Sequence, residues 1–538
     1  MASAISPRFR CLKEGDYFMQ SFMQMINSLI GLITPLNVLL LLASTCGGIL
    51  IGALPGLSAT MGIALLTGLT YTMSQDMALI VLLGIYVGGI YGGSISATLI
   101  GIPGTGSAAA TTLDGYPLAK KGLGREALST VTIASFIGTL IGMIFLAFLT
   151  PTLQDLALMF ASHEYALLAI FGVTICGTLT TEGSPLKGWI AGFLGLAFSC
   201  VGYEQLYSVP RLTFGNISLY SGIAFVPAMI GLFGLPNIFD NLAKNTKTDS
   251  VDVSNKVQQK ISVLSMVKTN LFGIVRAGLI GTGIGAVPGV GEDVAAWLSY
   301  DTAKRASKHQ EEFGKGSFEG IIASECANNA AIGGALIPLL SLAIPGSPPS
   351  AVLLGALQLH GIRPGPMLTF DQPDFIPYMA ALLLLASFMM RFSGWAICQV
   401  APKILRIPFF ILMPIVGVLS IIGAYALNVN MFDLVIMFVF GIIGYIFSKL
   451  KIPAAPIVLG LILGGMADSN FRRALQATRG SFTPFFTRPL ALLVLALIFF
   501  TIFSQTPPYQ KLKSKLTRKK KSMKASSKEQ CDENTDSN

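Results

Sequence analysis

The stretch YGGSISATLIGIPGTGSAAATTLDGYP, residues 91–117, interrupts a long apolar run with residues that end helices. Proline cannot donate a backbone hydrogen bond inside a helix, and glycine lacks the side chain that restrains the backbone. In a membrane, a broken helix frees N–H and C=O groups that lipid cannot satisfy, so the break must be buried in protein or face a watery cavity. The residues that break this run are Gly101, Pro103, Gly104 and Gly106, with the hydroxyls of Thr105 and Ser107 beside them.

The whole chain has the composition of a membrane protein. Its 538 residues are 52% hydrophobic and 12% charged, whereas soluble domains carry about 25% charged residues. Apolar runs that can cross a hydrocarbon core of about 30 Å recur without the alternation of barrel strands, which predicts an all-α polytopic membrane protein with about 10–12 spans. The runs cover residues 27–52, 76–100, 127–150, 165–181, 186–201, 219–239, 318–342, 376–396, 407–426, 430–448 and 486–504.

The chain contains an internal repeat. GALPGLSATMGIALLTGLTY (52–71) is matched by GAVPGVGEDVAAWLSY (285–300), and YGGSISATLIGIPGTGSAAA (91–110) is matched by IGGALIPLLSLAIPGSPPSA (332–351). One Pro-Gly pair in a membrane helix is usually a simple kink, but a duplicated pattern favours a functional role. The four pairs are Pro55-Gly56, Pro103-Gly104, Pro288-Gly289 and Pro345-Gly346.

Loop charges predict that the two repeats are inverted. Residues 301–317 are basic, whereas the corresponding connection at 72–75 carries no charge. Basic loops stay on the cytoplasmic side, so the two loops are expected to face opposite sides of the membrane. The expected organisation is an N-terminal segment (1–25), a first membrane half (26–239), a cytoplasmic linker (240–267), a second membrane half (268–504) and a basic disordered tail (505–538). Three arginines at 472, 473 and 479 fit this topology poorly, which suggests that the segment 453–488 is re-entrant.

Several functions are disfavoured by the sequence. The net charge of +10 is densest in the C-terminal tail, which indicates a topology signal near anionic lipid rather than nucleic-acid binding. The cysteines and histidines show neither metal spacing nor an arrangement for nucleophilic catalysis, and no phosphate-binding GxxxxGK[ST] motif is present. We therefore expect that the chain is not an enzyme and that it binds no cofactor. The expected coupling ion is Na⁺ or H⁺, and no other metal is expected.

The broken segments predict an anion site. A helix that restarts after Pro-Gly presents free N–H groups and the positive end of its dipole, which suit an anion, while carbonyls of the unwound stretch suit Na⁺. Hydroxyls and amides nearby add neutral hydrogen bonds. The candidate substrate-binding residues are Pro55, Gly56, Ser58, Pro103, Gly104, Thr105, Gly106, Ser107, Asn328, Asn329, Pro345, Gly346 and Ser347.

The second repeat adds acidic and amide side chains to this pattern. Glu292 and Asp293 follow Pro288-Gly289 in the first turn of the expected helix, where acids either cap the helix or bind a cation. These four residues are the candidates for the coupling-ion site. In ECANNAAIGG (325–334), the two asparagines fit either a substrate site or contacts between helices.

The chain resembles the large membrane subunit, of the TctA type, of the tripartite tricarboxylate transporters. The resemblance rests on residues 86–122, 288–300 and 313–368, and it continues through RLTFG (211–215) and IPAAPIVLGLILG (452–464). It implies a symporter in the bacterial inner membrane that imports tricarboxylates such as citrate, or other organic acids, with an ion gradient. It also implies two partners, a small membrane subunit and a periplasmic solute-binding protein.

Two other functions stay open at the level of sequence. A passive carboxylate channel or exchanger would show flux without ion dependence and without a binding protein. A membrane enzyme or assembly scaffold could use the broken helices as a cleft for lipid, although the chain lacks a convincing constellation of nucleophile and base.

Overall fold

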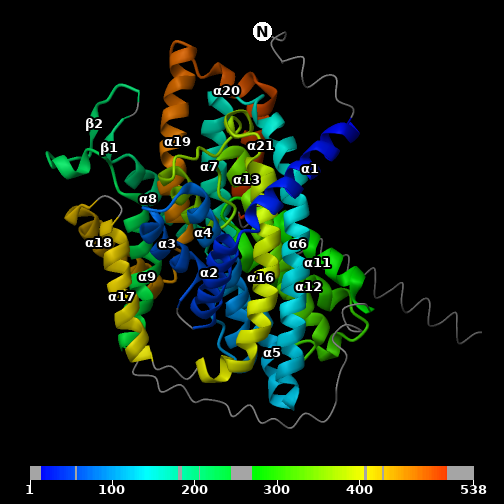
Figure 1. Ribbon diagram of the computed structural model, residues 1–538. Helices are drawn as coiled ribbons and strands as arrows, with labels where there is room; N and C mark the ends of the chain where they lie inside the picture. Colours follow the sequence, from blue (N-terminus) through cyan, green and yellow to red (C-terminus); the bar gives the residue numbers. More distant parts are fainter. Residues whose placement is uncertain are drawn as a thin grey trace, which may run out of the picture.

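The computed structural model is almost wholly helical, and it describes residues 14–54, 57–179, 184–204, 206–243, 269–404, 409–426 and 429–505 (Figure 1). Within these residues, two-residue strands form one antiparallel pair, β1 (Gly202–Tyr203) and β2 (Pro210–Arg211). The predicted linker beyond residue 243 and the predicted tail beyond residue 505 lie outside this description.

The first half of the chain runs from α1 to α9. Its helices are α1 (Glu14–Leu32), α2 (Pro35–Ala53), α3 (Ala59–Thr70), α4 (Gln75–Leu99), α5 (Ala109–Leu118), α6 (Gly124–Ala157), α7 (Ser162–Leu179), α8 (Pro185–Ser199) and α9 (Phe225–Ala243). Short turns η2 (Gly106–Ala108) and η3 (Ala119–Leu123) flank α5, and η4 (Ile217–Leu219) precedes α9.

The second half runs from α11 to α21. Its helices are α11 (Leu271–Gly285), α12 (Gly291–Ala306), α13 (Phe318–Leu342), α14 (Pro348–Leu359), α15 (Leu368–Asp371), α16 (Phe375–Ile404), α17 (Phe409–Ala426), α18 (Met431–Lys449), α19 (Ala455–Ala477), α20 (Thr483–Thr487) and α21 (Pro489–Ser504). The short turn η5 (Gln310–Glu312) lies between α12 and α13.

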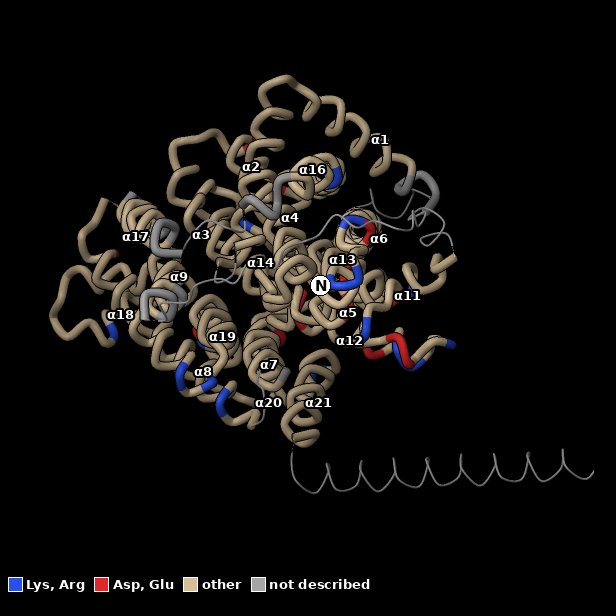
Figure 2. The backbone as a smooth tube through the Cα atoms, turned by 90° about the horizontal axis from the view of Figure 1, so that it is seen from below, with Lys and Arg blue, Asp and Glu red and all other residues tan. Residues whose placement is uncertain are grey.

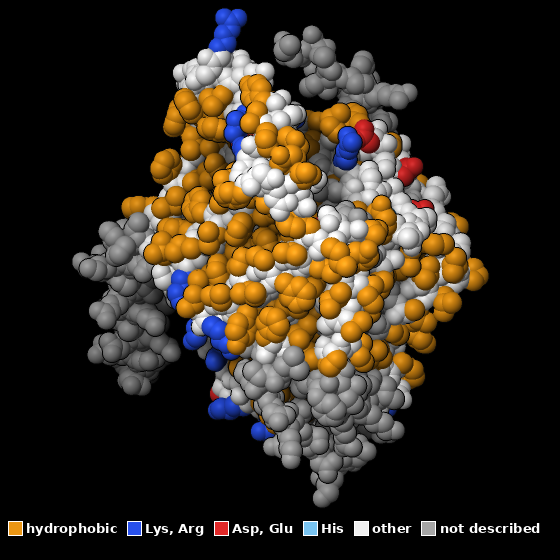
Figure 3. Space-filling model, turned by 90° about the vertical axis from the view of Figure 1, so that its left-hand side faces the viewer, with side chains coloured by type: hydrophobic (Ala, Val, Ile, Leu, Met, Phe, Trp, Pro, Cys, Tyr) orange, Lys and Arg blue, Asp and Glu red, His pale blue; other side chains and the backbone are white. Residues whose placement is uncertain are grey.

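The surface is that of a protein embedded in lipid. Within the part of the chain that the structure describes, five helical stretches are long and apolar enough to cross a membrane, namely Pro35–Ala53, Gln75–Leu99, Gly106–Ala157, Phe375–Gln399 and Met431–Lys449. Apolar side chains cover the middle of the face shown in Figure 3, and Lys and Arg lie toward its upper and lower parts. Seen from below, charged residues gather in the segment beside α12 (Figure 2). These observations confirm an all-α multi-pass membrane protein.

Each predicted apolar run coincides largely with a helix, although the run 219–239 begins before α9 and the run 486–504 begins in α20. A larger difference lies at the N-terminal end. The run 27–52 is divided between α1 and α2. The Thr34 side chain accepts a hydrogen bond from the Asn37 backbone N–H, and Pro35 stands at the first position of α2. A capping hydroxyl followed by proline is a strong helix start, so the local signals divide a stretch that is apolar throughout.

Helices α4 and α13 form the centre, and each packs against a neighbour through glycines. A Cβ on Gly52 of α2 would lie 2.1 Å from the Gly89 carbonyl oxygen of α4. A Cβ on Gly285 of α11 would lie 2.5 Å from the Ala331 carbonyl oxygen of α13. Gly52 and Gly285 each stand three residues before their Pro-Gly pair, so the two repeats make equivalent backbone contacts. That the repeats are inverted in the membrane stays a prediction.

A buried carboxylate in the middle of α5 links this helix to the loop before α13. Asp114 Oδ1 accepts hydrogen bonds from the backbone N–H groups of Gly314 (2.8 Å), Gly316 (2.9 Å) and Ser317 (2.9 Å), and its Oδ2 accepts one from the Tyr300 hydroxyl (2.8 Å). The Asp114 side chain is fully buried. It therefore joins the first repeat to α12 and α13 of the second.

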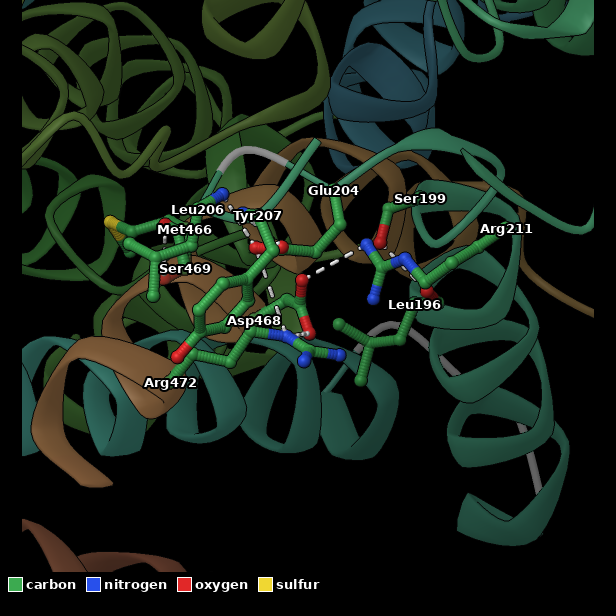
Figure 4. A network of polar contacts seen from close by, with 10 residues as sticks. All are labelled: Leu196, Ser199, Glu204, Leu206, Tyr207, Arg211, Met466, Asp468, Ser469 and Arg472. Atoms are coloured by element: carbon green, nitrogen blue, oxygen red, sulfur yellow. Dashed lines mark hydrogen bonds and ion pairs between the residues drawn. The ribbon is translucent and has the colours of Figure 1, made fainter. Parts of the chain in front are cut away.

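The β1–β2 hairpin is tied to α19 by an ionic network (Figure 4). Asp468 lies 3.0 Å from both Arg211 Nη2 and Arg472 Nε, and the carboxylate of Glu204 accepts the backbone N–H groups of residues 206 and 207 at 2.7 Å. Helix α19 is uninterrupted from Ala455 to Ala477, so no break in the helix accompanies these arginines. The charge of Arg472 is paired with Asp468, one turn earlier on the same helix, and lies 3.9 Å from Glu204 beside the hairpin.

Candidate functional site

Helices end and restart at all four Pro-Gly positions, as predicted. Pro55 and Gly56 themselves lie outside the described residues. The breaks separate Ala53 from Ala59, Leu99 from Gly106, Gly285 from Gly291, and Leu342 from Pro348.

Three of these breaks meet at one place. The Gly289 N–H donates to the Pro345 carbonyl oxygen at 3.2 Å, and a Cβ on Gly291 would lie 2.9 Å from the Ser347 Cβ. Across the two halves, a Cβ on Gly106 would lie 2.6 Å from Asp293 Oδ2. The starts of α12 and α14 and the turn η2 are therefore in contact.

Two of the breaks need glycine for close backbone approach. A Cβ on Gly104 would lie 1.9 Å from the Gly52 carbonyl oxygen, and a Cβ on Gly346 would lie 2.0 Å from the Gly285 carbonyl oxygen. Both glycines also donate their N–H to the helix that precedes the break, at 3.2 Å and 3.4 Å. The equivalent geometry shows that the repeat extends from the helix pairs to the breaks.

The candidate hydroxyls mainly shape the helix starts. The Ser58 side chain accepts the Met61 N–H at 3.2 Å at the start of α3. Ser347 and Ser350 form a capping box at the start of α14. Thr105 and Ser107 are buried, and their hydroxyl oxygens lie 3.1 Å apart. The caps satisfy some of the free N–H groups, while the dipoles of α12 and α14 keep their positive ends at the meeting point.

The two predicted acids occupy different environments in the first turn of α12. Glu292 is 2% exposed, and its Oε1 accepts a hydrogen bond of 2.5 Å from the Tyr86 hydroxyl. That hydroxyl also lies 2.9 Å from Ser347 Oγ, so it joins two breaks. Asp293 is exposed to solvent beside Gly106. Sequence reasoning missed Tyr86, because its partners are 206 and 261 residues away and no local pattern marks it.

Asn328 and Asn329 are buried on α13 and only partly satisfied. Asn329 Nδ2 donates to the Glu325 carbonyl oxygen at 3.1 Å. Asn329 Oδ1 and both polar atoms of the Asn328 amide make no hydrogen bond within the described residues. Such buried amides require a partner such as water or a ligand. Asn328 stands 18 residues before Gly346 (346 − 328), as Tyr86 stands 18 before Gly104 (104 − 86), so it occupies the equivalent place in the second repeat.

The fold and the site define a multi-pass α-helical membrane protein with broken helices meeting at its centre, an arrangement known from secondary transporters. Residues 38–459 match the Tripartite tricarboxylate transporter TctA family. The chain belongs to this family and is a subunit of a tripartite tricarboxylate transporter.

Two proteins of Agrobacterium vitis are similar to the chain. The "Uncharacterized 52.8 kDa protein in TAR-I ttuC' 3'region" is 36% identical over 464 residues, which cover 86% of this chain and 92% of that protein. The "Uncharacterized protein in TAR-II ttuC' 3'region" is 36% identical over 217 residues, which cover 40% of this chain and 90% of that protein. No solved structure matches the chain.

Proposed function

We propose that this subunit forms the transport pathway of an ion-gradient-driven importer of tricarboxylates or related organic acids in the bacterial inner membrane. A periplasmic solute-binding protein would deliver the substrate, and a small membrane subunit would complete the transporter. The observation that carries the proposal is the meeting of broken segments from both halves at one place.

The substrate would be held without a basic side chain. The segments 52–60, 99–110, 285–295 and 342–351 contain no lysine or arginine. Helix N-termini supply free N–H groups and a positive potential, and the amides of Asn328 and Asn329 offer unsatisfied polar atoms. An anion bound mainly by backbone dipoles can also leave, since no strong ion pair holds it.

Two acids that could bind a coupling cation lie beside the candidate substrate site. Glu292 and Asp293 lie in the first turn of α12, directly after Pro288 and Gly289. A cation at these acids would reduce their repulsion of a carboxylate substrate, so the two ligands would favour each other's binding.

Reconstituted transport tests this proposal. The protein and its small partner subunit are placed in proteoliposomes with a cognate binding protein outside, and uptake of labelled carboxylates is driven by imposed Na⁺ or H⁺ gradients. Replacing Pro103-Gly104 or Pro345-Gly346 by Ala-Ala should abolish accumulation while the protein stays in the membrane. Gly283→Ala is the control, because a Cβ there meets nothing within 4 Å. Normal uptake by both double variants would contradict the proposal, and gradient-independent equilibration would indicate a passive channel or exchanger.

A further inference from the structure

A second buried carboxyl group lies outside the breaks. Glu325 of α13 is fully buried and receives three hydroxyl donors. Ser94 Oγ of α4 donates to its Oε1 at 2.6 Å, Ser135 Oγ of α6 donates to its Oε2 at 3.1 Å, and the Thr111 hydroxyl of α5 donates to its Oε1. All three donors belong to the first half of the chain and the acid belongs to the second.

No positively charged side chain of the described residues forms an ion pair with this carboxyl group. Glu325 is absent from the ion pairs of the described residues, and it lies inside α13, where helix N–H groups are already used. An ionised carboxylate in such a place is costly, so the group is stable only with a cation or a proton. The titratable groups of the described chain that interact with it are Tyr91 of α4 and Cys326 beside it, and both side chains are neutral near pH 7.

The donors around Glu325 suit both protonation states. A hydroxyl donates to a carboxylate, and after a small rotation it accepts from a carboxylic acid. Two other buried acids have partners that favour the charged form: Asp114 Oδ1 accepts three backbone N–H groups, and Glu164 pairs with Arg488 at 2.6 Å. Backbone N–H groups and guanidinium groups can only donate. Glu292 accepts a hydrogen bond from the Tyr86 hydroxyl, but Glu325 is the buried acid of the described chain whose side-chain oxygens are surrounded by three hydroxyl donors.

The oxygens around the carboxyl group lie at hydrogen-bonding distance. Ser94 Oγ and Ser135 Oγ lie 2.6 Å and 3.1 Å from the carboxyl oxygens, which corresponds to direct hydrogen bonds. A proton taken up by Glu325 would therefore find a hydroxyl oxygen in place to accept its O–H.

The Glu325 pocket adjoins the candidate substrate site. Thr111 stands one helical turn after Ser107, and Ser94 follows Gly93, whose carbonyl oxygen accepts the Gly104 N–H at 3.2 Å. Asn328 stands one turn after Glu325 and approaches its carboxyl group, but neither polar atom of its amide forms a hydrogen bond of good geometry in the described chain. A change in the protonation of Glu325 would therefore directly affect the break at Pro103-Gly104 and the unsatisfied amide of Asn328.

We propose that Glu325 carries the coupling proton of the transporter. The incoming proton bonds to a carboxylate oxygen of Glu325, and a neighbouring hydroxyl turns to accept the new O–H. On release, the proton passes to water on the cytoplasmic side, and the hydroxyl turns back to donate to the carboxylate. This inference rests on the proposed function, and it assigns the coupling proton to a residue other than Glu292 and Asp293.

The variant Glu325→Gln tests the proposal, since glutamine imitates the protonated acid. In proteoliposomes with the partner subunit and binding protein, we expect it to keep exchange of labelled for unlabelled substrate within about twofold of wild type. We expect at least tenfold loss of accumulation driven by a pH gradient, and loss of substrate-dependent proton movement reported by an internal pH dye. Glu319→Gln, on the same helix outside the pocket, should retain all three activities.

A second variant distinguishes a loss of proton coupling from a folding defect in Glu325→Gln. Ser135→Ala removes one donor to the charged form, so accumulation should reach half its maximum at a pH about half to one unit higher. Proton-coupled accumulation by Glu325→Gln, an unshifted Ser135→Ala profile, or accumulation by wild type that needs a Na⁺ gradient and moves no protons would overturn the assignment. Absence of gradient-driven uptake and exchange in the wild-type complex would instead contradict the proposed function.

Discussion

Replacing Asp114 should destabilise the protein far more than replacing an exposed aspartate of the neighbouring helix. Asp114→Ala removes the acceptor for three backbone N–H groups and one tyrosine hydroxyl. The N–H of Ser317 is left in a buried place, whereas Gly314 is exposed and its N–H can find water.

The size of the loss follows from these contacts. A hydrogen bond to a charged group contributes about 1.5–3 kcal/mol, and a buried donor without a partner costs about 1–3 kcal/mol. Allowing for water at the exposed glycine, Asp114→Ala should lower the free energy of unfolding by about 3–5 kcal/mol. Tyr300→Phe, which removes one bond to the same carboxylate, should lower it by about 1 kcal/mol.

Reversible unfolding in mixed micelles measures these differences. Asp301→Asn is the matched control, since its ion pair with Arg305 is exposed and should contribute less than about 1 kcal/mol. If Asp114→Ala unfolds with the same free energy as Asp301→Asn, the carboxylate does not join the two repeats as described.

Three further changes separate binding from stability. Tyr86→Phe removes the hydroxyl that donates to Glu292, so uptake should fall at least tenfold and thermal unfolding should begin at lower temperature; unchanged uptake would contradict a role for this contact. Asn328→Leu should abolish substrate uptake without lowering the thermal midpoint, because it replaces a buried amide that has no hydrogen bond in the described residues. Asp468→Asn loosens the β1–β2 hairpin and should cost about 1 kcal/mol in unfolding assays, with uptake near wild type.

The broken helices could be predicted from sequence because their causes are local. Proline and glycine act on the backbone where they stand, and duplication marked all four positions as related. The first-turn placement of Glu292 and Asp293 followed from the same logic and is confirmed. A search for long apolar runs could not find α3 and α14, which are only 12 residues long, and it could not find α12 because acidic and basic side chains interrupt that helix.

The contacts that give the site its chemistry could not be predicted in the same way. Tyr86 and Glu292, or Ser94 and Glu325, are more than 200 residues apart, and only tertiary packing brings them together. Serine and threonine are common in membrane helices as local partners of carbonyl groups. Their role as donors to a buried acid therefore leaves no pattern in the sequence.

The two repeats share their backbone geometry but not their chemistry. Counted from the Pro-Gly pairs, Glu292 corresponds to Ala59 (292 − 288 = 59 − 55), and Glu325 corresponds to Leu83 (346 − 325 = 104 − 83). The acids thus belong to the second repeat alone, while both repeats present breaks of equivalent geometry. Under the proposals above, the anion is bound by the part that the repeats share, namely helix N-termini and glycine backbone. The proton is bound by the part in which they differ, so a change in coupling ion would require changes at Glu325 and its hydroxyl donors and would leave the breaks intact.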